Sequence, residues 1–92
     1  MEITNVKCTK YNGAVKNLLA FVDVTIDDCL VIHNIRIVTR VDGTRFLSFP
    51  SERRVDPENA EHTYFSDLVH PINRETRKLF EDAVFAEFDR SE

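Results

Sequence analysis

The chain has few of the residues that build metal centres and disulfide frameworks. Its 92 residues include two cysteines, three histidines, two glycines and no tryptophan. Cys8 and Cys29 have neither the number nor the spacing of a disulfide framework or a metal site, and His33, His62 and His70 lie far from them and from one another. We therefore expect buried, reduced thiols, and neither a metal ion nor another cofactor.

Long apolar runs and catalytic motifs are also missing. No apolar run approaches the roughly 18 residues of a membrane span, and the N-terminus has no signal-peptide core. We therefore expect a cytoplasmic protein without a membrane partner. No nucleophile elbow, glycine-rich phosphate loop or pair of inward carboxylates is present, so we expect neither an enzyme nor a small-molecule substrate.

The length and composition that are present predict one globular domain over residues 1–92. The chain is 42% hydrophobic and 30% charged, which is ordinary for a globular protein. A domain of this size buries only about two-thirds of the surface of its unfolded chain. Association with a second copy would therefore add stability.

The net charge of −4 is unevenly distributed along the chain. Residues 36–54 carry +3 and residues 70–78 carry +2, whereas residues 1–35 carry −1 and residues 55–69 and 79–92 carry −4 each. Salt screens charges beyond about 8 Å, so a local basic patch can still attract phosphate. The acidic total predicts modest affinity that depends steeply on salt.

Alternating apolar residues predict strands over residues 2–10, 17–26, 29–38 and 45–49. In the clearest of them, the apolar face is expected to hold Leu18, Ala20, Val22, Val24 and Ile26, and the opposite face Leu19, Phe21, Asp23 and Thr25. Asp27-Asp28 is expected to close one hairpin, and Asp42-Gly43 predicts a second with a two-residue turn. Pro50 is expected to end the last of these strands.

Residues 51–62 are polar and lack apolar periodicity, which predicts a long loop. Residues 63–65 are expected to form a short edge strand. A helix is predicted from about Arg74 to about Asp89. Its apolar stripe is expected to hold Phe80, Ala83, Val84 and Phe88, with Leu79 alongside. Phe85 is expected to point away from this stripe.

These elements predict an α+β fold, with a small antiparallel β-sheet arranged as a meander and followed by one C-terminal α-helix. Leu19, Phe21 and Phe85 are more apolar surface than one helix on one sheet face requires. This excess supports a homodimer.

The start of the helix is the leading candidate site. His70 precedes a proline and ends the preceding segment, and Asn73 can cap the helix. Arg74, Arg77 and Lys78 then follow, although cations near a helix start usually cost stability. Exposed N–H groups and clustered cations would suit a phosphate.

The alternative for these cations is a solvated helix face. Glu75 would pair with Lys78 and Arg77 with Glu81 at helical spacing. Charge spacing by itself favours this alternative.

Two further groups of residues have open interpretations. Arg36, Arg40 and Arg45 surround one hairpin, where solubilising charge is favoured over a basic strand face that continues toward the helix start. Aromatic side chains could stack bases, but their spacing favours core positions: Phe46, Phe49, Tyr64 and Phe65.

Several stretches in order resemble the stage V sporulation protein G (SpoVG, septation regulator) family. The pattern D-[IL]-x-H-P-I-N-x-x-T-R matches residues 67–77 and opens the C-terminal helix. Further similarity covers nearly the whole chain: residues 1–7, 31–37, 49–51 and 82–84 with Glu87.

The resemblance implies a homodimer joined through strands and a regulator that binds DNA or RNA and influences gene expression, septation or sporulation. It places nucleic-acid contacts at the helix start, where Arg77 matches the family pattern, and after Pro50-Ser51, where Arg53 fits. Glu52, Ser66 and Arg74 depart from that pattern. The expected nucleic-acid contacts are Arg53, Arg54, His70, Asn73, Arg74, Arg77 and Lys78. The alternative is a non-catalytic protein-interaction module that uses its sheet edge or second helix face.

Overall fold

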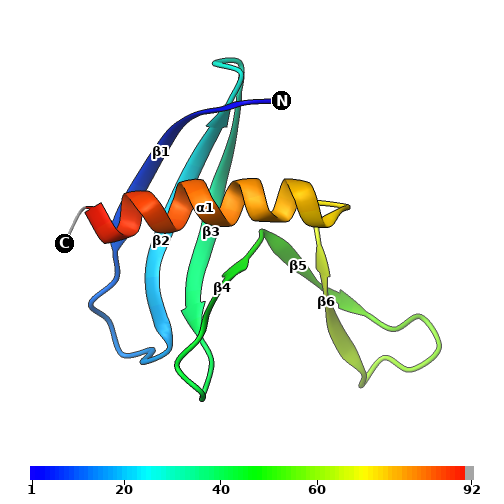
Figure 1. Ribbon diagram of the computed structural model, residues 1–92. Coiled ribbons are helices and arrows are strands. Elements are labelled where there is room, and N and C mark those ends of the chain that lie inside the picture. The colour runs from blue at the N-terminus through cyan, green and yellow to red at the C-terminus, as the bar shows by residue number, and fades with distance from the viewer. Residues whose placement is uncertain (91–92) are drawn as a thin grey trace.

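The computed structural model describes residues 1–90 and shows the predicted α+β fold (Figure 1). Six strands precede one C-terminal helix. In chain order they are β1 (Ile3–Lys10), β2 (Leu18–Ile26), β3 (Leu30–Thr39), β4 (Arg45–Ser48), β5 (Ser51–Val55), β6 (Thr63–Asp67) and α1 (Arg74–Arg90). Within residues 1–90 no helix is long and apolar enough to cross a membrane.

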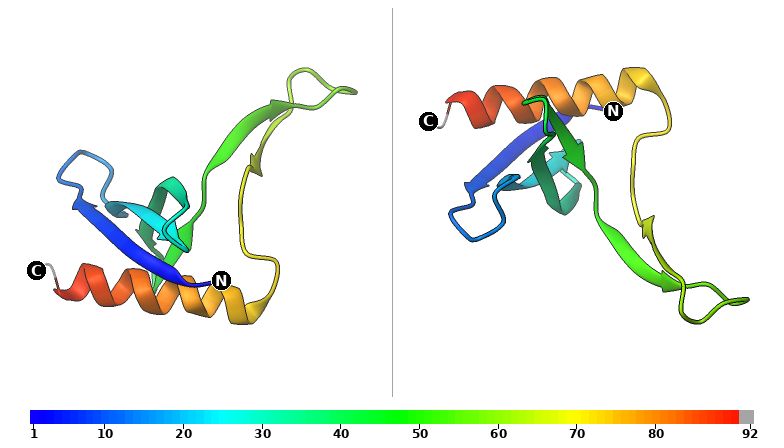
Figure 2. Two further views of the ribbon diagram at one scale, coloured as in Figure 1. Left: turned by 90° about the horizontal axis from the view of Figure 1, so that it is seen from above. Right: turned by 90° about the horizontal axis from the view of Figure 1, so that it is seen from below.

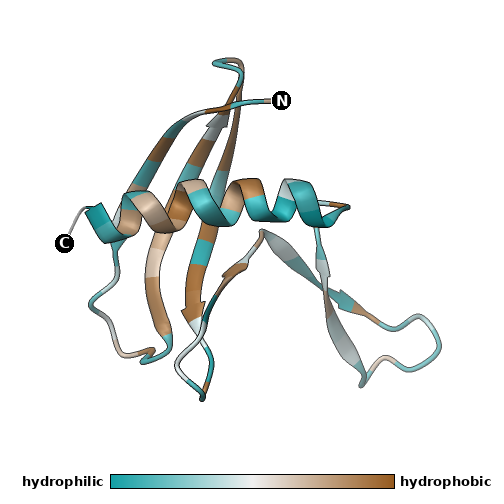
Figure 3. Ribbon diagram, viewed as in Figure 1, coloured by the Kyte–Doolittle hydropathy of each residue, from teal (hydrophilic) through white to brown (hydrophobic). Residues whose placement is uncertain are grey.

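The first four strands form one antiparallel sheet in the order β1-β2-β3-β4, and α1 crosses one face of it (Figures 1 and 3). Apolar side chains from that sheet face pack against three helix residues spaced four apart, Phe80, Val84 and Phe88. This spacing places all three on one helix face. The strands contribute Ala20, Val22, Val24, Ile26, Ile35, Ile37 and Leu47 to the same core, and Phe49 follows β4.

The turn between β2 and β3 has the conformation that its sequence predicts. Asp27 and Asp28 both adopt positive φ angles, 52° and 53°. Two consecutive positive φ angles are typical of a type I′ hairpin turn, whose twist matches that of the flanking strands. The two aspartates therefore close this hairpin as expected.

The turn between β3 and β4 differs from the predicted two-residue turn. Arg40 donates its N–H to the carbonyl oxygen of Thr44 at 2.8 Å, which leaves three residues in the loop. Gly43 has a φ of 90° and donates its N–H to the Arg40 carbonyl oxygen at 3.0 Å. A three-residue loop with glycine in the left-handed region gives an equally compact hairpin.

The predicted faces of β2 are wrong for its first two residues, Leu18 and Leu19, because the strand contains a bulge. The pairing shifts between Leu18 and Ala20. Leu18 pairs with Val38, while Leu19 packs against the core. An inserted residue shifts every side chain before it to the other face, so alternation alone places these two leucines wrongly.

Phe85 does not form the expected second helix face. Its side chain is half-buried and packs against the core. The Arg45 guanidinium lies 4.6 Å from the centre of the Phe85 ring and donates a hydrogen bond to Asp89 Oδ1 at 2.7 Å. Arg45 thus joins β4 to α1 and is not a solubilising charge on a free strand.

The prediction of a loop over residues 51–62 is wrong for residues 51–55, which form strand β5. β5 and β6 pair as a separate antiparallel hairpin, which we call the arm. Residues 56–62 form its tip. All five residues of β5 are exposed, so neither face carries the apolar alternation that identifies a strand in a sequence.

The solvent exposure of one cysteine and of two aromatic residues contradicts the expectation that they are buried. Cys29 follows the β2–β3 turn and is exposed, while Cys8 is half-buried with the pKa of its thiol raised, mainly by burial and also by Glu87. Phe49 is in the core as expected and Phe46 is half-buried. Tyr64 and Phe65, which lie on the arm, are exposed.

Candidate functional site

The start of α1 is capped as the sequence predicts. Asn73 Oδ1 accepts a hydrogen bond from the Thr76 N–H at 2.8 Å, and the Asn73 carbonyl oxygen accepts the Arg77 N–H at 3.1 Å. The N–H groups of Arg74 and Glu75 belong to the first turn, where helix geometry provides no partner within the helix. Two donors are therefore left directed out of the helix end.

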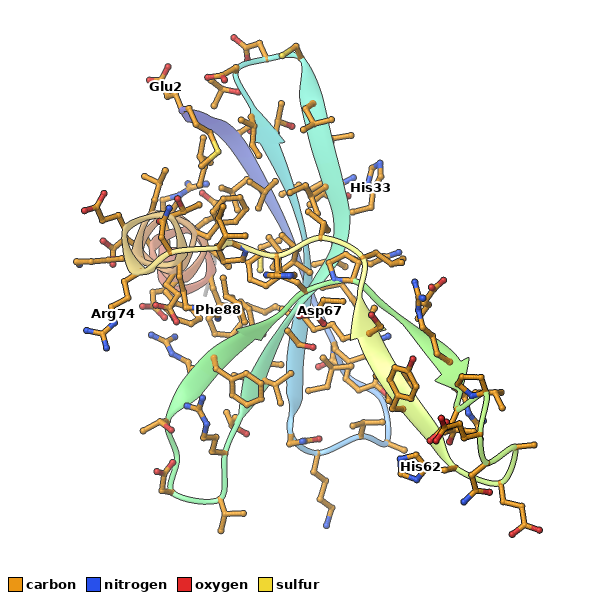
Figure 4. The ribbon with its side chains drawn as sticks, turned by 90° about the vertical axis from the view of Figure 1, so that its right-hand side faces the viewer. Glu2, His33, His62, Asp67, Arg74 and Phe88 are labelled. Carbon is orange, nitrogen blue, oxygen red and sulfur yellow. The ribbon has the colours of Figure 1, made fainter. Side chains whose placement is uncertain are left out.

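The three cations of the helix start have different environments. Figure 4 shows the Arg74 side chain extending away from both helix and sheet. Within residues 1–90 it has no carboxylate partner. The Arg77 guanidinium lies 5.7 Å from the centre of the Phe49 ring, and Lys78 Nζ lies 3.0 Å from Asp82 Oδ2.

The alternative ion pairs expected from spacing are replaced by others. Within the described residues Lys78 pairs with Asp82 one turn later, not with Glu75, and Arg77 lies over an aromatic ring. Lys78 is thus partly neutralised. Within residues 1–90, neither Arg74 nor Arg77 forms an ion pair with a carboxylate.

His70 supports the turn that leads into the helix. Its Nδ1 lies 3.0 Å from the carbonyl oxygen of Pro71, within hydrogen-bond distance. The imidazole is exposed beside the helix start. Its observed role is therefore local.

Arg53 and Arg54 lie on the arm and not beside the helix start. The arm projects from the side of the sheet opposite α1 (Figures 2 and 4). Arg54 pairs with Glu52 at 2.6 Å, and Arg53 donates a hydrogen bond to Thr63 Oγ1 at 3.4 Å. One chain therefore presents the cations of the helix start and the two arginines of the arm in separate places, and acids outnumber bases along the arm.

An apolar pocket of about 170 Å³ lies directly behind the helix start. Thr76 and Phe80 line it from α1, Val69 and Pro71 from the preceding turn, and Phe49 from the segment after β4. Its walls offer few polar groups that could orient a small polar ligand. The cations of the helix start are not among the residues that line this pocket.

Phe49 is the part of the site that sequence patterns did not reveal. Its ring packs against Phe80, with centroids 5.5 Å apart, and carries the Arg77 guanidinium on another side. This contact fixes where Arg77 lies relative to the sheet. Because Phe49 is distant in the chain from the helix start, only the folded structure shows the link.

The whole described chain is similar to one family of proteins. The SpoVG family model matches residues 1–90. A relative from Anaeromyxobacter sp. (strain Fw109-5) is 37% identical over 98% of this chain and 84% of its own length. Another from Borrelia hermsii is 39% identical over 96% and 86%, and one from Bdellovibrio bacteriovorus 32% over 98% and 75%. All three bear the name "Putative septation protein SpoVG".

Proposed function

The chain belongs to the SpoVG family, and on that premise we propose that it binds nucleic acid through the start of α1 and acts as a regulator. The septation named in its relatives is one process that it would influence, with gene expression and sporulation as others. The ligand is the phosphate backbone of DNA or RNA. The proposal gives the chain no catalytic step.

The observation that carries the proposal is a capped helix start with uncompensated cations. Asn73 occupies the Thr76 N–H, and the two remaining N–H groups of the first turn point outward. The helix dipole adds positive potential at the same place. Arg74 is free to move onto a phosphate oxygen, and Arg77 is held nearby by Phe49.

The arm supplies two further arginines in this proposal, although acids outnumber bases along it. Arg53 and Arg54 are exposed on β5, and the arm projects from the side of the sheet opposite α1. A homodimer would present two helix starts and two arms, so that one nucleic acid could contact several of them. Such multiple contacts would offset the acidic total of the chain.

The first test removes the two uncompensated cations. We expect Arg74→Ala with Arg77→Ala to weaken binding of a labelled DNA duplex by about tenfold or more in low salt. The slope of log affinity against log salt should also fall by about two, because each lost phosphate contact changes it by about one. Fluorescence anisotropy titrations at several stated salt concentrations measure both quantities.

Arg90→Ala is a control for each of these two substitutions, because it removes one positive charge from the opposite end of the helix. Arg90 pairs with Glu87, and its replacement should leave the affinity within about twofold. If the double variant at the helix start binds as tightly as the unmodified chain, the phosphate site is not there.

A protein-interaction module is the second candidate function. The observation that favours it is the arm, whose exposed apolar side chains include Val55, Tyr64 and Phe65. A protein partner bound there should be retained by the Arg74→Ala, Arg77→Ala variant and lost with Phe65→Asp. If partner binding depends on Arg74 and Arg77 instead, the arm is not its docking surface.

A further inference from the structure

The sheet has a second face, turned away from α1, on which arginines lie over aromatic rings. Phe21 pairs across the strands with Arg36, whose guanidinium lies 5.8 Å from the ring centre. Directly after the end of β3, the Arg40 guanidinium lies 4.4 Å from the centre of the Phe46 ring. We call this surface the open face.

Part of the open face is hollowed into a groove of about 390 Å³. Phe21 and Arg36 are among its lining residues, and Tyr11 stands edge-on to Phe21 with ring centroids 5.8 Å apart. Among residues 1–90, the groove lining contains a cation and aromatic rings but no acidic side chain: Tyr11, Val15, Asn17, Leu18, Phe21, Arg36, Val38 and Ser48.

We infer that the open face is a stacking surface for single-stranded nucleic acid, separate from the phosphate site at the helix start. The inference rests on the proposed function for its ligand class. It adds a preference for unpaired bases, which the helix start cannot provide because phosphates are the same in single strands and duplexes. The acting residues are Arg36 with Phe21 and Arg40 with Phe46.

The chemistry of the two pairs favours unpaired bases. A guanidinium that lies over an aromatic ring is held as an oriented, planar cation, and unstacked bases stack on such planes and on aromatic rings. Arg36 and Arg40 are four residues apart, which corresponds to about 13 Å along a strand. In a duplex the base faces are already stacked on one another, so this surface would offer it only charge.

Charge complementarity favours a polyanion over a second copy of the chain. Two copies joined through this face about a two-fold axis would bring like arginines together. Asp23 is an acid on this face. Its Oδ1 lies 3.3 Å from His33 Nδ1 and accepts a hydrogen bond from the Asn34 N–H at 3.3 Å. The arm projects from the same side of the sheet, but acids outnumber bases in it and Arg54 is paired with Glu52, so the cationic surface is that of the sheet itself.

The test compares charge with planarity. Arg36→Lys with Arg40→Lys keeps both charges and removes both planar groups. We expect this variant to bind labelled oligothymidylate about tenfold more weakly, while its affinity for the oligothymidylate–oligoadenylate duplex changes by less than about twofold. Arg36→Ala with Arg40→Ala removes charge and planar group together. Loss of single-strand affinity in this alanine pair but not in the lysine pair would show that charge alone acts, and would overturn the inference.

A spectroscopic measurement locates the contact. The chain has two tyrosines and no tryptophan, so Tyr64→Phe leaves Tyr11 as the reporter in the groove. Oligothymidylate should quench its emission, and the lysine pair should reduce that quenching at saturation. Unchanged emission, or a change in sedimentation mass caused by the lysine pair, would identify the face as something other than a base-stacking surface.

The outcomes for the two sites are distinguishable. Arg74→Ala with Arg77→Ala should weaken single-strand and duplex binding alike, whereas the open-face variant weakens only single-strand binding. If only the open-face variant has an effect, the helix-start site fails and the stacking surface stands. If the open-face variant weakens both ligands equally, the stacking surface fails and the helix-start site is unaffected.

Discussion

The body of the molecule, formed by β1 to β4 and α1, and the arm, formed by β5 and β6, are stabilised in different ways. In the body, β2 buries every second residue from Ala20 to Ile26 against the helix. In the arm, β5 is exposed at all five positions, and Phe65 in β6 is 74% exposed. The body is therefore held by apolar burial, and the arm by its backbone hydrogen bonds.

The shape of the chain shows the same difference. Its Cα radius of gyration is 14.7 Å, whereas a compact domain of this length would have about 12 Å. The excess comes from the arm, which extends beyond the sheet (Figure 2). A lone two-stranded hairpin is only marginally stable in water, so the arm is the part of this fold that gains most from a partner.

The largest expected effect is the difference in stability between two phenylalanine-to-alanine variants, one in the body and one in the arm. Phe80→Ala should lower the free energy of unfolding by about 3–5 kcal/mol, because the Phe80 side chain is 3% exposed and its loss leaves a cavity in the core. Phe65→Ala should change it by less than about 0.5 kcal/mol. Urea unfolding of both variants at low protein concentration measures the difference.

Equal losses in the two variants would mean that the arm is part of the folding core. Phe80→Leu is a milder core substitution that keeps the body measurable if the alanine variant does not fold. Its loss should fall between those of the other two variants, because leucine refills part of the cavity.

The two regions also differ in how well their sequences predict them. Alternation from Ala20 to Ile26 and the spacing of Phe80, Val84 and Phe88 predicted the core, because burial imposes those periods. Asn73 predicted the cap from a local hydrogen bond. β5 gave no such signal, since Ser51 to Val55 are exposed on both faces and the strand is defined only by its pairing with β6.

At the candidate site, local chemistry was predictable and long-range placement was not. Asn73 and the neighbouring cations are consecutive in sequence, so their association follows from one helix turn. The Phe49 ring beneath Arg77, and the separation of Arg53 from Arg74 by the sheet, depend on how distant segments pack. The bulge that exchanges the faces of Leu18 and Leu19 is likewise invisible to a strict period of two.

An intermediate effect is expected from charging the arm. If a second copy covers the arm, Phe65→Asp should raise the dimer dissociation constant by about tenfold to a hundredfold, because a carboxylate would replace a buried ring. Sedimentation equilibrium across micromolar concentrations measures this change. The unfolding free energy of the monomer should remain close to that of the unmodified chain.

Asn59→Asp is the matched control, because it adds the same charge at the exposed tip of the arm. Its dissociation constant should stay within about threefold of the unmodified value, since rim charges contribute little. A monomeric mass for the unmodified chain throughout the micromolar range would contradict the homodimer and leave the arm without a second copy.

The smallest expected effect concerns the ion pairs of the two regions. In the body, the hydrogen bond from Arg45 holds the pKa of Asp89 below its ordinary value near 3.8. A lowered folded-state pKa contributes stability that is present above the unfolded pKa and is lost as the pH falls through the folded pKa. Asp89→Asn should therefore slightly lower stability at neutral pH and flatten its decline below about pH 4.

Glu52→Gln is the corresponding change in the arm, where it removes the pair with Arg54. Neither Glu52 nor Arg54 packs against the core. The urea unfolding midpoint of this variant should therefore equal that of the unmodified chain, within the scatter of repeated titrations, at every pH between 3 and 7. Asp89 differs because its partner Arg45 also lies over Phe85 and Phe88, which couples that ion pair to the helix–sheet contact. An acid response of equal size in both variants would place the two ion pairs in the same cooperative unit and would remove the distinction between body and arm.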